Sequence, residues 1–211
     1  MLEAAEEDVV FEDGKAFVKG SPDQAKTIQE IAAAAALGYS LPEGMEPFLD
    51  DTSYYDAPDC TFPFGTHICL VEVESETGQV RIRRYVAVDD CGRAINPLIV
   101  DGQVHGGIAQ GVGQALWEAA VYSPSGQLVS GTLLNYALPR AGDFPLLGLS
   151  RTETPSPVNP LGVKGIGEAG TIASTPAVVN AVMDALAPFG VRHVDMPLTA
   201  EKVWQAMQAN R

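Results

Sequence analysis

HICLVEVESETGQVRIRRYVAVD, residues 67–89, carries the plainest structural pattern in the chain. Two runs alternate apolar with polar side chains, and a glycine-containing break at 76–78 separates them. Alternation with a period of two is typical of strands that bury one face, and a short break with glycine joins such strands into a hairpin. We therefore expect an antiparallel hairpin from Thr66 to Asp89. Its predicted solvent-facing residues are Glu72, Glu74, Arg81 and Arg83.

Upstream of this hairpin the patterns are shorter. Residues 9–19 read VVFEDGKAFVK, two β-type runs around Asp-Gly, which indicates a second hairpin. Ser21-Pro22 resembles a cap and first turn, so a helix is predicted from there through Leu37. Residues 38–64 are rich in Pro, Gly and Asp and follow neither period, which predicts an irregular connection.

Downstream, a weaker strand pair is expected around Tyr122 and over 127–137. A helix is predicted from Thr175-Pro176 to about Ala187, and a last one follows 197–199 through Gln208. Mixed β-hairpins and helices of this kind predict an α+β fold. The 211 residues can form one domain, or two subdomains of about 1–65 and 66–211.

Composition excludes several classes of protein. The net charge is −14 and only 13 residues are Lys or Arg, which argues against nucleic-acid binding. No apolar run approaches the ~20 residues of a membrane span, and the N-terminus is acidic, so we expect no membrane span and a cytoplasmic location. Cys60, Cys69 and Cys91 lack metal-binding spacing and are expected to be buried thiols.

The segment DGQVHGGIAQGVGQALWEAA, residues 101–120, has apolar residues at helical spacing and yet carries glycines at 106, 107, 111 and 113. Each glycine costs a helix about 1 kcal/mol relative to alanine. Close approach of another backbone or of a ligand would explain the glycines, because glycine has no Cβ in the way. Gln103 and Gln110 lie on one face of this helix and could bind a ligand. A tightly packed helix pair with surface glutamines is an equal alternative.

A second glycine-rich stretch, GVKGIGEAG at 162–170, contains a single acid, Glu168. The loop leads toward the predicted helix N-terminus near 174–176, an arrangement that favours anions. A carboxylate in a nonpolar pocket has a raised pKa and can act as a general base; an exposed turn acid is the alternative. The spacing also matches a dinucleotide fingerprint, but three prolines rather than a buried strand precede it.

Taken together, the motifs resemble one family. DDCGRAINPLIVDGQVHGG at 89–107 and KGIGE at 164–168 look like the C-terminal part of the large, molybdopterin-binding subunit of the xanthine oxidase family. The carbon monoxide dehydrogenase type is the most similar. SYYDAPDCTFPFG at 53–65 and DMPLTAEKVW at 195–204 are similar too, so the resemblance covers nearly the whole chain.

The resemblance implies a molybdenum-dependent oxidoreductase that binds molybdopterin cytosine dinucleotide. Glu168 would be the base beside molybdenum in an oxidative hydroxylation. Electrons would leave through [2Fe–2S] clusters on a small subunit and FAD on a medium subunit. The residues that the resemblance assigns to cofactor binding are Gln103, Gly106, Gly107, Lys164, Gly165, Ile166 and Gly167.

A complete large subunit of this family is several times longer, so the resemblance also implies the remainder of the large subunit as a partner. We expect a split subunit, a truncated gene or a fragment, and an isolated chain without activity or molybdenum. Ala169-Gly170 departs from the family pattern and leaves carbon monoxide, aldehydes and N-heterocycles open as substrates. The alternative is a non-catalytic remnant or an assembly module that interacts with other proteins without a cofactor.

Overall fold

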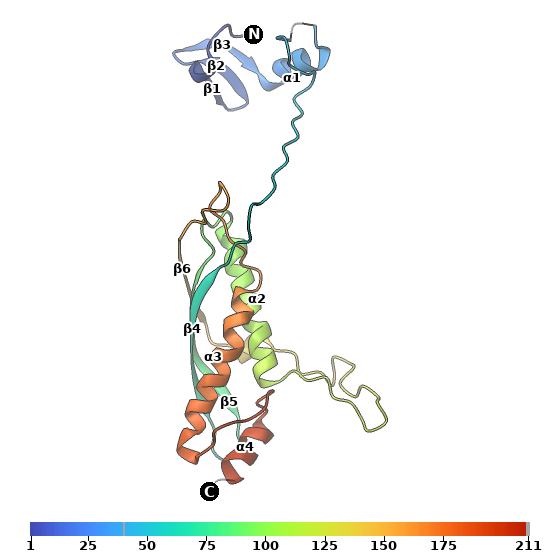
Figure 1. The fold of residues 1–211 in the computed structure, drawn as a ribbon, viewed down its shortest axis with the longest axis vertical. Helices are drawn as coiled ribbons and strands as arrows, with labels where there is room; N and C mark the ends of the chain where they lie inside the picture. Colours follow the sequence, from blue (N-terminus) through green and yellow to red (C-terminus); the bar gives the residue numbers. More distant parts are fainter. Residues whose placement is uncertain (40, 210–211) are drawn as a thin grey trace. The chain divides into compact units, whose positions relative to one another are not determined.

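The computed structural model describes residues 1–39 and 41–209. The chain divides into two compact units, Met1–Asp56 and Ala57–Arg211. The division therefore lies about nine residues before the position near 65 that the sequence patterns suggested. Helices and strands occur in both units, which confirms the α+β class (Figure 1).

The first unit is a three-stranded antiparallel sheet followed by a helix (Figure 1). The predicted hairpin is confirmed, with Val9 paired to Val18 across the turn. The elements of this unit are η1 (Glu6–Asp8), β1 (Val9–Glu12), β2 (Lys15–Val18), β3 (Ser21–Thr27) and α1 (Ile28–Leu37).

The predicted start of the first helix at Ser21-Pro22 is wrong. Residues Ser21–Thr27 form strand β3, because they extend the hairpin as a third strand, with Lys26 paired to Ala16. The helix begins at Ile28 after Thr27. The Thr27 hydroxyl accepts from the backbone N–H of Glu30 at 3.2 Å, and the Glu30 carboxylate accepts from the backbone N–H of Thr27 at 2.8 Å. This reciprocal capping box is a stronger start signal than Ser-Pro.

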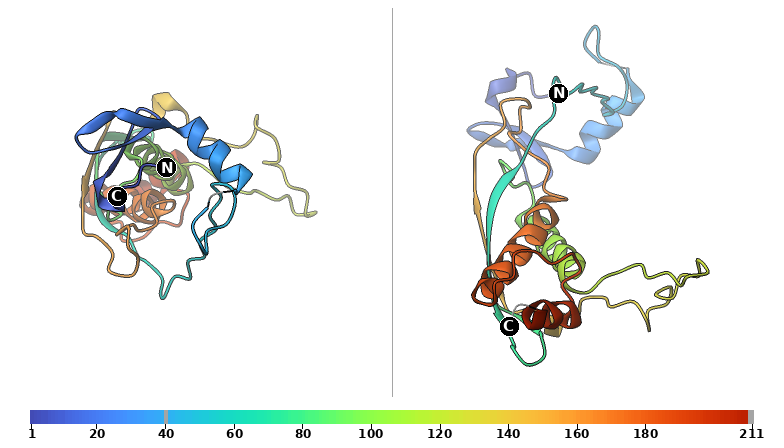
Figure 2. Two further views of the ribbon diagram at one scale, coloured as in Figure 1. Left: turned by 90° about the horizontal axis from the view of Figure 1, so that it is seen from above. Right: turned by 60° about the horizontal axis from the view of Figure 1, so that its bottom comes forward.

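The second unit has two layers, a three-stranded sheet and a pair of long helices that cover one of its faces (Figures 1 and 2). Strands β4 and β5 are antiparallel, and β6 pairs with β5 in parallel. The elements are β4 (Phe64–Val73), β5 (Val80–Asp90), α2 (Pro97–Leu116), η2 (Ala141–Asp143), β6 (Leu147–Thr152), α3 (Ala169–Leu186), η3 (Ala187–Phe189) and α4 (Ala200–Ala209).

The hairpin of 66–89 is confirmed as strands β4 and β5. Its inner face contributes Tyr85, which is fully buried, and its outer face carries an ion pair between Glu72 and Arg83 at 2.6 Å. The inner face packs on an apolar core between the sheet and the helices. The fully buried residues of that core include Ile108, Val112, Leu116, Val178, Val182, Leu186, Leu198, Val203 and Met207.

Two other predictions change. Helix α2 begins at Pro97 rather than at residue 101, because the Asn96 side chain caps it by accepting from the backbone N–H of Ile99 at 3.3 Å. The weak strand pair near Tyr122 is reduced to one bridge, between Tyr122 and Leu128. The connection between α2 and η2, which contains this bridge, extends away from the two layers (Figures 1 and 2).

Helix α3 with the turn after it, Ala169–Phe189, is long and apolar enough by length and composition alone to cross a membrane. The expectation that no run approaches that length is therefore wrong. Val178, Val182 and Leu186 nevertheless bury one face of α3 completely in the core of the second unit. In this fold α3 is a core helix.

Candidate functional site

Helices α2 and α3 approach each other at glycines, and this contact builds the candidate site. A Cβ on Gly107 would lie 2.9 Å from the Cα of Gly170, and a Cβ on Gly170 would lie 2.7 Å from the carbonyl oxygen of Val104. Any side chain at either position would force the helices apart. The backbone of the first turn of α3 thus rests directly on the backbone of α2.

One turn further along, the same contact is polar. The Thr175 hydroxyl donates to the carbonyl oxygen of Gly111 at 3.2 Å, and Ser174 is fully buried beside it. A Cβ on Gly111 would lie 1.9 Å from the Ser174 hydroxyl oxygen. The packed-helix interpretation therefore accounts for Gly107 and Gly111. Gly106 is exposed, and a Cβ there would meet nothing within 4 Å.

Glu168 lies at the N-cap position of α3, so the loop ends and the helix begins within the glycine motif. The sequence placed that start at Thr175-Pro176, which is wrong: Pro176 lies inside the helix. The Glu168 carbonyl accepts from the backbone N–H groups of Thr171 at 3.1 Å and Ile172 at 3.0 Å. Its side chain is exposed and makes no capping hydrogen bond. A helix N-terminus favours a negative charge at this position.

The two predicted key residues are close in sequence to the helix contact. Gln103 immediately precedes Val104, whose carbonyl touches α3, and Glu168 precedes Gly170 by two positions. Both side chains are exposed. Residues 65 positions apart in the sequence therefore share one region of the second unit.

The loop residues between Lys164 and Glu168 differ in environment. Gly165 and Gly167 are exposed, with open space where a Cβ would project, whereas Ile166 packs partly against the core. The side chain of Lys164 is only 9% exposed, and its ammonium donates to Asp90 at 3.1 Å. The loop thus presents backbone to solvent while the Lys164 side chain turns inward.

Asp90 is the buried partner of that lysine, and sequence reasoning missed it. Burial by itself would raise the pKa of Asp90, but hydrogen bonds from the backbone N–H of Gly92, from the Lys164 ammonium, and from the hydroxyls of Thr154 and Thr152 together hold it well below the ordinary value. The Gly92 and Thr152 bonds measure 2.9 and 3.0 Å. The sequence does contain a signal for it. Asp89 and Asp90 are adjacent acids at the end of a strand with a buried face, and a buried carboxylate needs hydrogen-bond partners.

A second buried polar path crosses the core beside the helix contact. The carboxylate of Asp89 lies 3.3 Å from the Nε2 of His67, whose Nδ1 lies 2.8 Å from the hydroxyl of Tyr85. The Tyr85 hydroxyl is hydrogen-bonded in turn to Ser174 of α3. Burial, reinforced by Cys69 and Asp89, raises the pKa of Tyr85. The path ties both strands of the hairpin to α3 near the candidate site.

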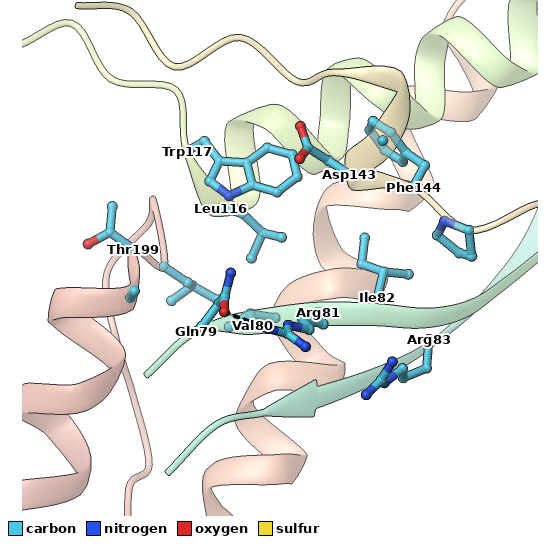
Figure 3. A pocket seen from close by; sticks show the side chains of 14 residues that line it. Gln79, Val80, Arg81, Ile82, Arg83, Leu116, Trp117, Asp143, Phe144 and Thr199 are labelled. Atoms are coloured by element: carbon cyan, nitrogen blue, oxygen red, sulfur yellow. Dashed lines mark hydrogen bonds between the residues drawn. The ribbon is translucent and has the colours of Figure 1, made fainter. Parts of the chain in front are cut away.

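The second unit has several hollows. One of about 590 Å³ is lined by Ile82, Leu116, Trp117 and Phe144 and by the charged Arg81 (Figure 3). It lies at the C-terminal end of α2, far along the helix from Gln103.

A smaller hollow of about 240 Å³ includes Lys164 and Ile166. Gln103 and Glu168 line neither hollow, so these two residues occupy an open surface of this chain.

The expectation that all three cysteines are buried is wrong. Cys60 is exposed, Cys69 is half-buried and Cys91 is buried. Within residues 1–39 and 41–209, no group of three or more His, Cys, Asp or Glu side chains could hold a metal ion.

Comparison with known proteins identifies the family. The family described as "Molybdopterin cofactor-binding domain" matches residues 1–145. The chain is 40% identical to the carbon monoxide dehydrogenase large chain of Hydrogenophaga pseudoflava over 99% of its own length and 26% of that protein. It is 42% identical to the nicotine 6-hydroxylase large subunit of Paenarthrobacter nicotinovorans over 98% of its length and 25% of that protein.

Solved structures agree with this assignment. The crystal structure of a Cu,Mo-containing carbon monoxide dehydrogenase superposes with a TM-score of 0.84 at 36% identity, over 99% of this chain and 26% of that chain. Quinoline 2-oxidoreductase from Pseudomonas putida 86 gives 0.84 at 42% identity, over 98% and 26%. The chain spans about a quarter of the length of these relatives. It belongs to the molybdopterin cofactor-binding domain family and corresponds to part of the large subunit of carbon monoxide dehydrogenase-like molybdenum hydroxylases.

Proposed function

We propose that the chain supplies one wall of the molybdenum-cofactor site of a molybdenum hydroxylase, with Glu168 as the base and Gln103 as a cofactor ligand. The observation that carries the proposal is the glycine contact between α2 and α3, which joins the turn bearing Gln103 to the helix start bearing Glu168. The family assignment supplies the cofactor class.

The residues on this wall fit a large planar ligand. Gly165 and Gly167 are exposed and have open space where a Cβ would project, so a ligand can approach their backbone, and Gly106 leaves the same open space on the surface of α2. The Gln103 amide offers a donor and an acceptor beside them. When bound, the cofactor would supply a molybdenum centre that accepts reducing equivalents from the substrate. Glu168, held at the start of α3, would take up the proton released there.

The finer assignments belong to the same proposal. The cofactor is the cytosine dinucleotide form of molybdopterin, and the partners are the remainder of the large subunit, a medium subunit with FAD and a small subunit with [2Fe–2S] clusters. The relatives act on different molecules, by their names carbon monoxide, nicotine and quinoline. The substrate class therefore lies between carbon monoxide, aldehydes and N-heterocycles.

The test is a Glu168→Gln variant of the protein purified with its associated polypeptides. Turnover of carbon monoxide, nicotine or quinoline, whichever the unmodified protein oxidises, should fall at least 100-fold, because a general base contributes about 10²–10⁴-fold. Molybdenum content, measured by plasma mass spectrometry, should stay unchanged. Glu76→Gln, a matched change in the exposed β4–β5 turn, is the control and should retain turnover.

Retained turnover in Glu168→Gln would remove the base assignment. Absence of molybdenum from the unmodified protein with its partners would instead support the interaction-module alternative.

A further inference from the structure

Asp90 is a fully buried carboxylate for which the proposed chemistry has no use. Four donors converge on it from three parts of the second unit. These are the backbone N–H of Gly92, the hydroxyls of Thr152 and Thr154 at the end of β6, and the ammonium of Lys164. A buried charge with that many partners is an anchor for the segments that carry the donors.

Lys164 is the donor that reaches Asp90 from the glycine loop. Its ammonium lies 3.1 Å from the Asp90 carboxylate and 4.6 Å from the ring centroid of Phe64. The resemblance gave Lys164 a role in holding the cofactor, whereas this side chain is directed into the protein. Its charge is balanced within the chain by Asp90.

The backbone around this pair is fastened as well. The backbone N–H of Lys164 donates to the carbonyl of Cys91 at 2.8 Å, and that of Arg93 donates to the carbonyl of Gly162 at 3.0 Å. Gly92 has φ of 65°, and a Cβ there would lie 2.1 Å from the carbonyl oxygen of Gly162. The start of the loop is thus fixed to the end of β5.

The other end of the same loop is fixed by α3. Gly170 rests on the backbone of α2, and Glu168 is the N-cap residue. Only Gly165, Ile166 and Gly167 lie between the ion pair and Glu168. A loop this short, held at both ends, leaves the acid little freedom to move.

We propose that Asp90 and Lys164 are positioning residues that hold the loop carrying Glu168 in place. This inference rests on the proposed function for the role of Glu168, but the fastening of the loop is a separate physical claim. Removing one partner would leave the other as an uncompensated buried charge, which is more disruptive than replacing both. The pair is therefore expected to behave as a unit.

The experiment compares Asp90→Asn, Lys164→Met, Lys164→Arg and the double variant Asp90→Asn/Lys164→Met in the full protein with its associated polypeptides. Hydrogen exchange of the peptide covering 162–170 is read by mass spectrometry. Exchange should quicken at least 10-fold in each neutralising single variant and less in the double variant. Lys164→Arg, which keeps the charge, should stay within 3-fold of the unmodified protein.

Steady-state kinetics with carbon monoxide, nicotine or quinoline give the second readout. The neutralising single variants should lower kcat at least 10-fold while KM changes less than 3-fold. Lys164→Arg should instead retain the kcat of the unmodified protein. A general loss of folding would not produce that split or that rescue. Glu72→Gln/Arg83→Met, which removes the half-exposed ion pair on the outer face of the sheet, is the matched control and should change neither readout.

Unchanged exchange at 162–170 in both neutralising single variants would overturn the inference, whatever the activity. Quickened exchange with unchanged kcat would overturn the link to Glu168 and leave an anchor of purely structural effect. If the unmodified protein holds no molybdenum, the proposed function fails, while the exchange data still decide whether the pair fastens the loop.

Discussion

Glu168 stands among glycines because the loop ends at it and a helix begins. The glycines on either side serve different purposes: Gly165 and Gly167 leave open space, whereas Gly170 allows α3 to touch α2. The backbone next to Glu168 is therefore fixed by helix packing, while the Glu168 side chain is exposed to solvent. The sequence predicted the loop, and the exposed Glu168 side chain matches the exposed-turn alternative rather than a nonpolar pocket within this chain. The position of the helix start depends on a contact with a helix about 60 residues earlier.

The buried ion pair of Asp90 and Lys164 predicts a stability effect with a definite pH dependence. The pKa of Asp90 lies well below that of an unfolded Asp, about 3.9. The folded state therefore binds this proton less tightly than the unfolded state. The stabilisation is fully present above about pH 4 and is lost as the pH falls further.

Lys164→Met should lower the free energy of unfolding at pH 7 by about 3–5 kcal/mol, because it leaves a buried charge without a partner. The double variant Asp90→Asn/Lys164→Met should lose less. It should also lose less stability than the unmodified protein when the pH is lowered from 5 to 3. Urea unfolding at each pH measures this, with the exposed Asp184→Asn as control. An equally steep acid limb in the double variant would contradict the assignment to Asp90.

The three cysteines should differ in reactivity. Burial raises the pKa of Cys69 to about 11 and also raises that of Cys91, whereas Cys60 is exposed. Because the thiolate is the reactive form, the folded protein should show one fast thiol toward Ellman's reagent at pH 8. Unfolding in guanidinium should expose all 3. Cys60→Ser should abolish the fast phase; a fast phase that survives this change would show that another thiol is accessible.

At the scale of helices and strands, local sequence patterns predicted an element correctly where no pairing with a distant segment favoured another structure. The alternation over 66–89 gave β4 and β5, and the helical spacing after residue 101 gave most of α2. Ser21-Pro22 misled because strand pairing with β2 outweighed a cap signal, and the T-x-x-E pattern at Thr27 was the better signal. Strand β6 was missed because six residues without clear alternation carry no period, and only its pairing with β5 defines it.

The glycines of α2 allow a matched test of the helix contact. Gly107→Ala should lower the free energy of unfolding by about 1–3 kcal/mol, because its Cβ would lie 2.9 Å from backbone atoms of Gly170 and Thr171 that cannot rotate away. Gly102→Ala, in the same helix but with nothing within 4 Å of its Cβ, should gain about 0.5–1 kcal/mol from helix propensity. Thermal and urea unfolding of the two variants measure the difference. Equal effects would show that α2 and α3 do not touch at Gly107.

On the scale of the second unit, one face of the sheet is covered by helices and the other is not. Ile68 and Leu70 on the outer face of β4 are 65% and 59% exposed, beside the polar Glu72–Arg83 pair. An uncovered sheet face is usually polar along its whole length, and exposed apolar side chains indicate a surface that another polypeptide covers. This agrees with the proposal that the chain works together with the remainder of a large subunit.

The proposed cofactor surface is also uncovered, and this gives a prediction for the molecule as a whole. The exposed side chains of Gln103 and Glu168 and the open backbone at Gly165 and Gly167 form a surface rather than an enclosed cavity. A tightly held organic cofactor is normally buried over most of its area. One wall cannot provide that burial, so the chain purified alone should contain no molybdenum above the level of a control protein by plasma mass spectrometry.

Co-expression with polypeptides that cover the rest of the large-subunit sequence should raise the molybdenum content toward one metal per chain, and Gln103→Ala should lower it again. Gln208→Ala, in the last turn of α4, is the matched control and should leave the metal content unchanged. Stoichiometric molybdenum in the chain alone would mean that the exposed surface closes over its ligand without help, and the one-wall description would be wrong.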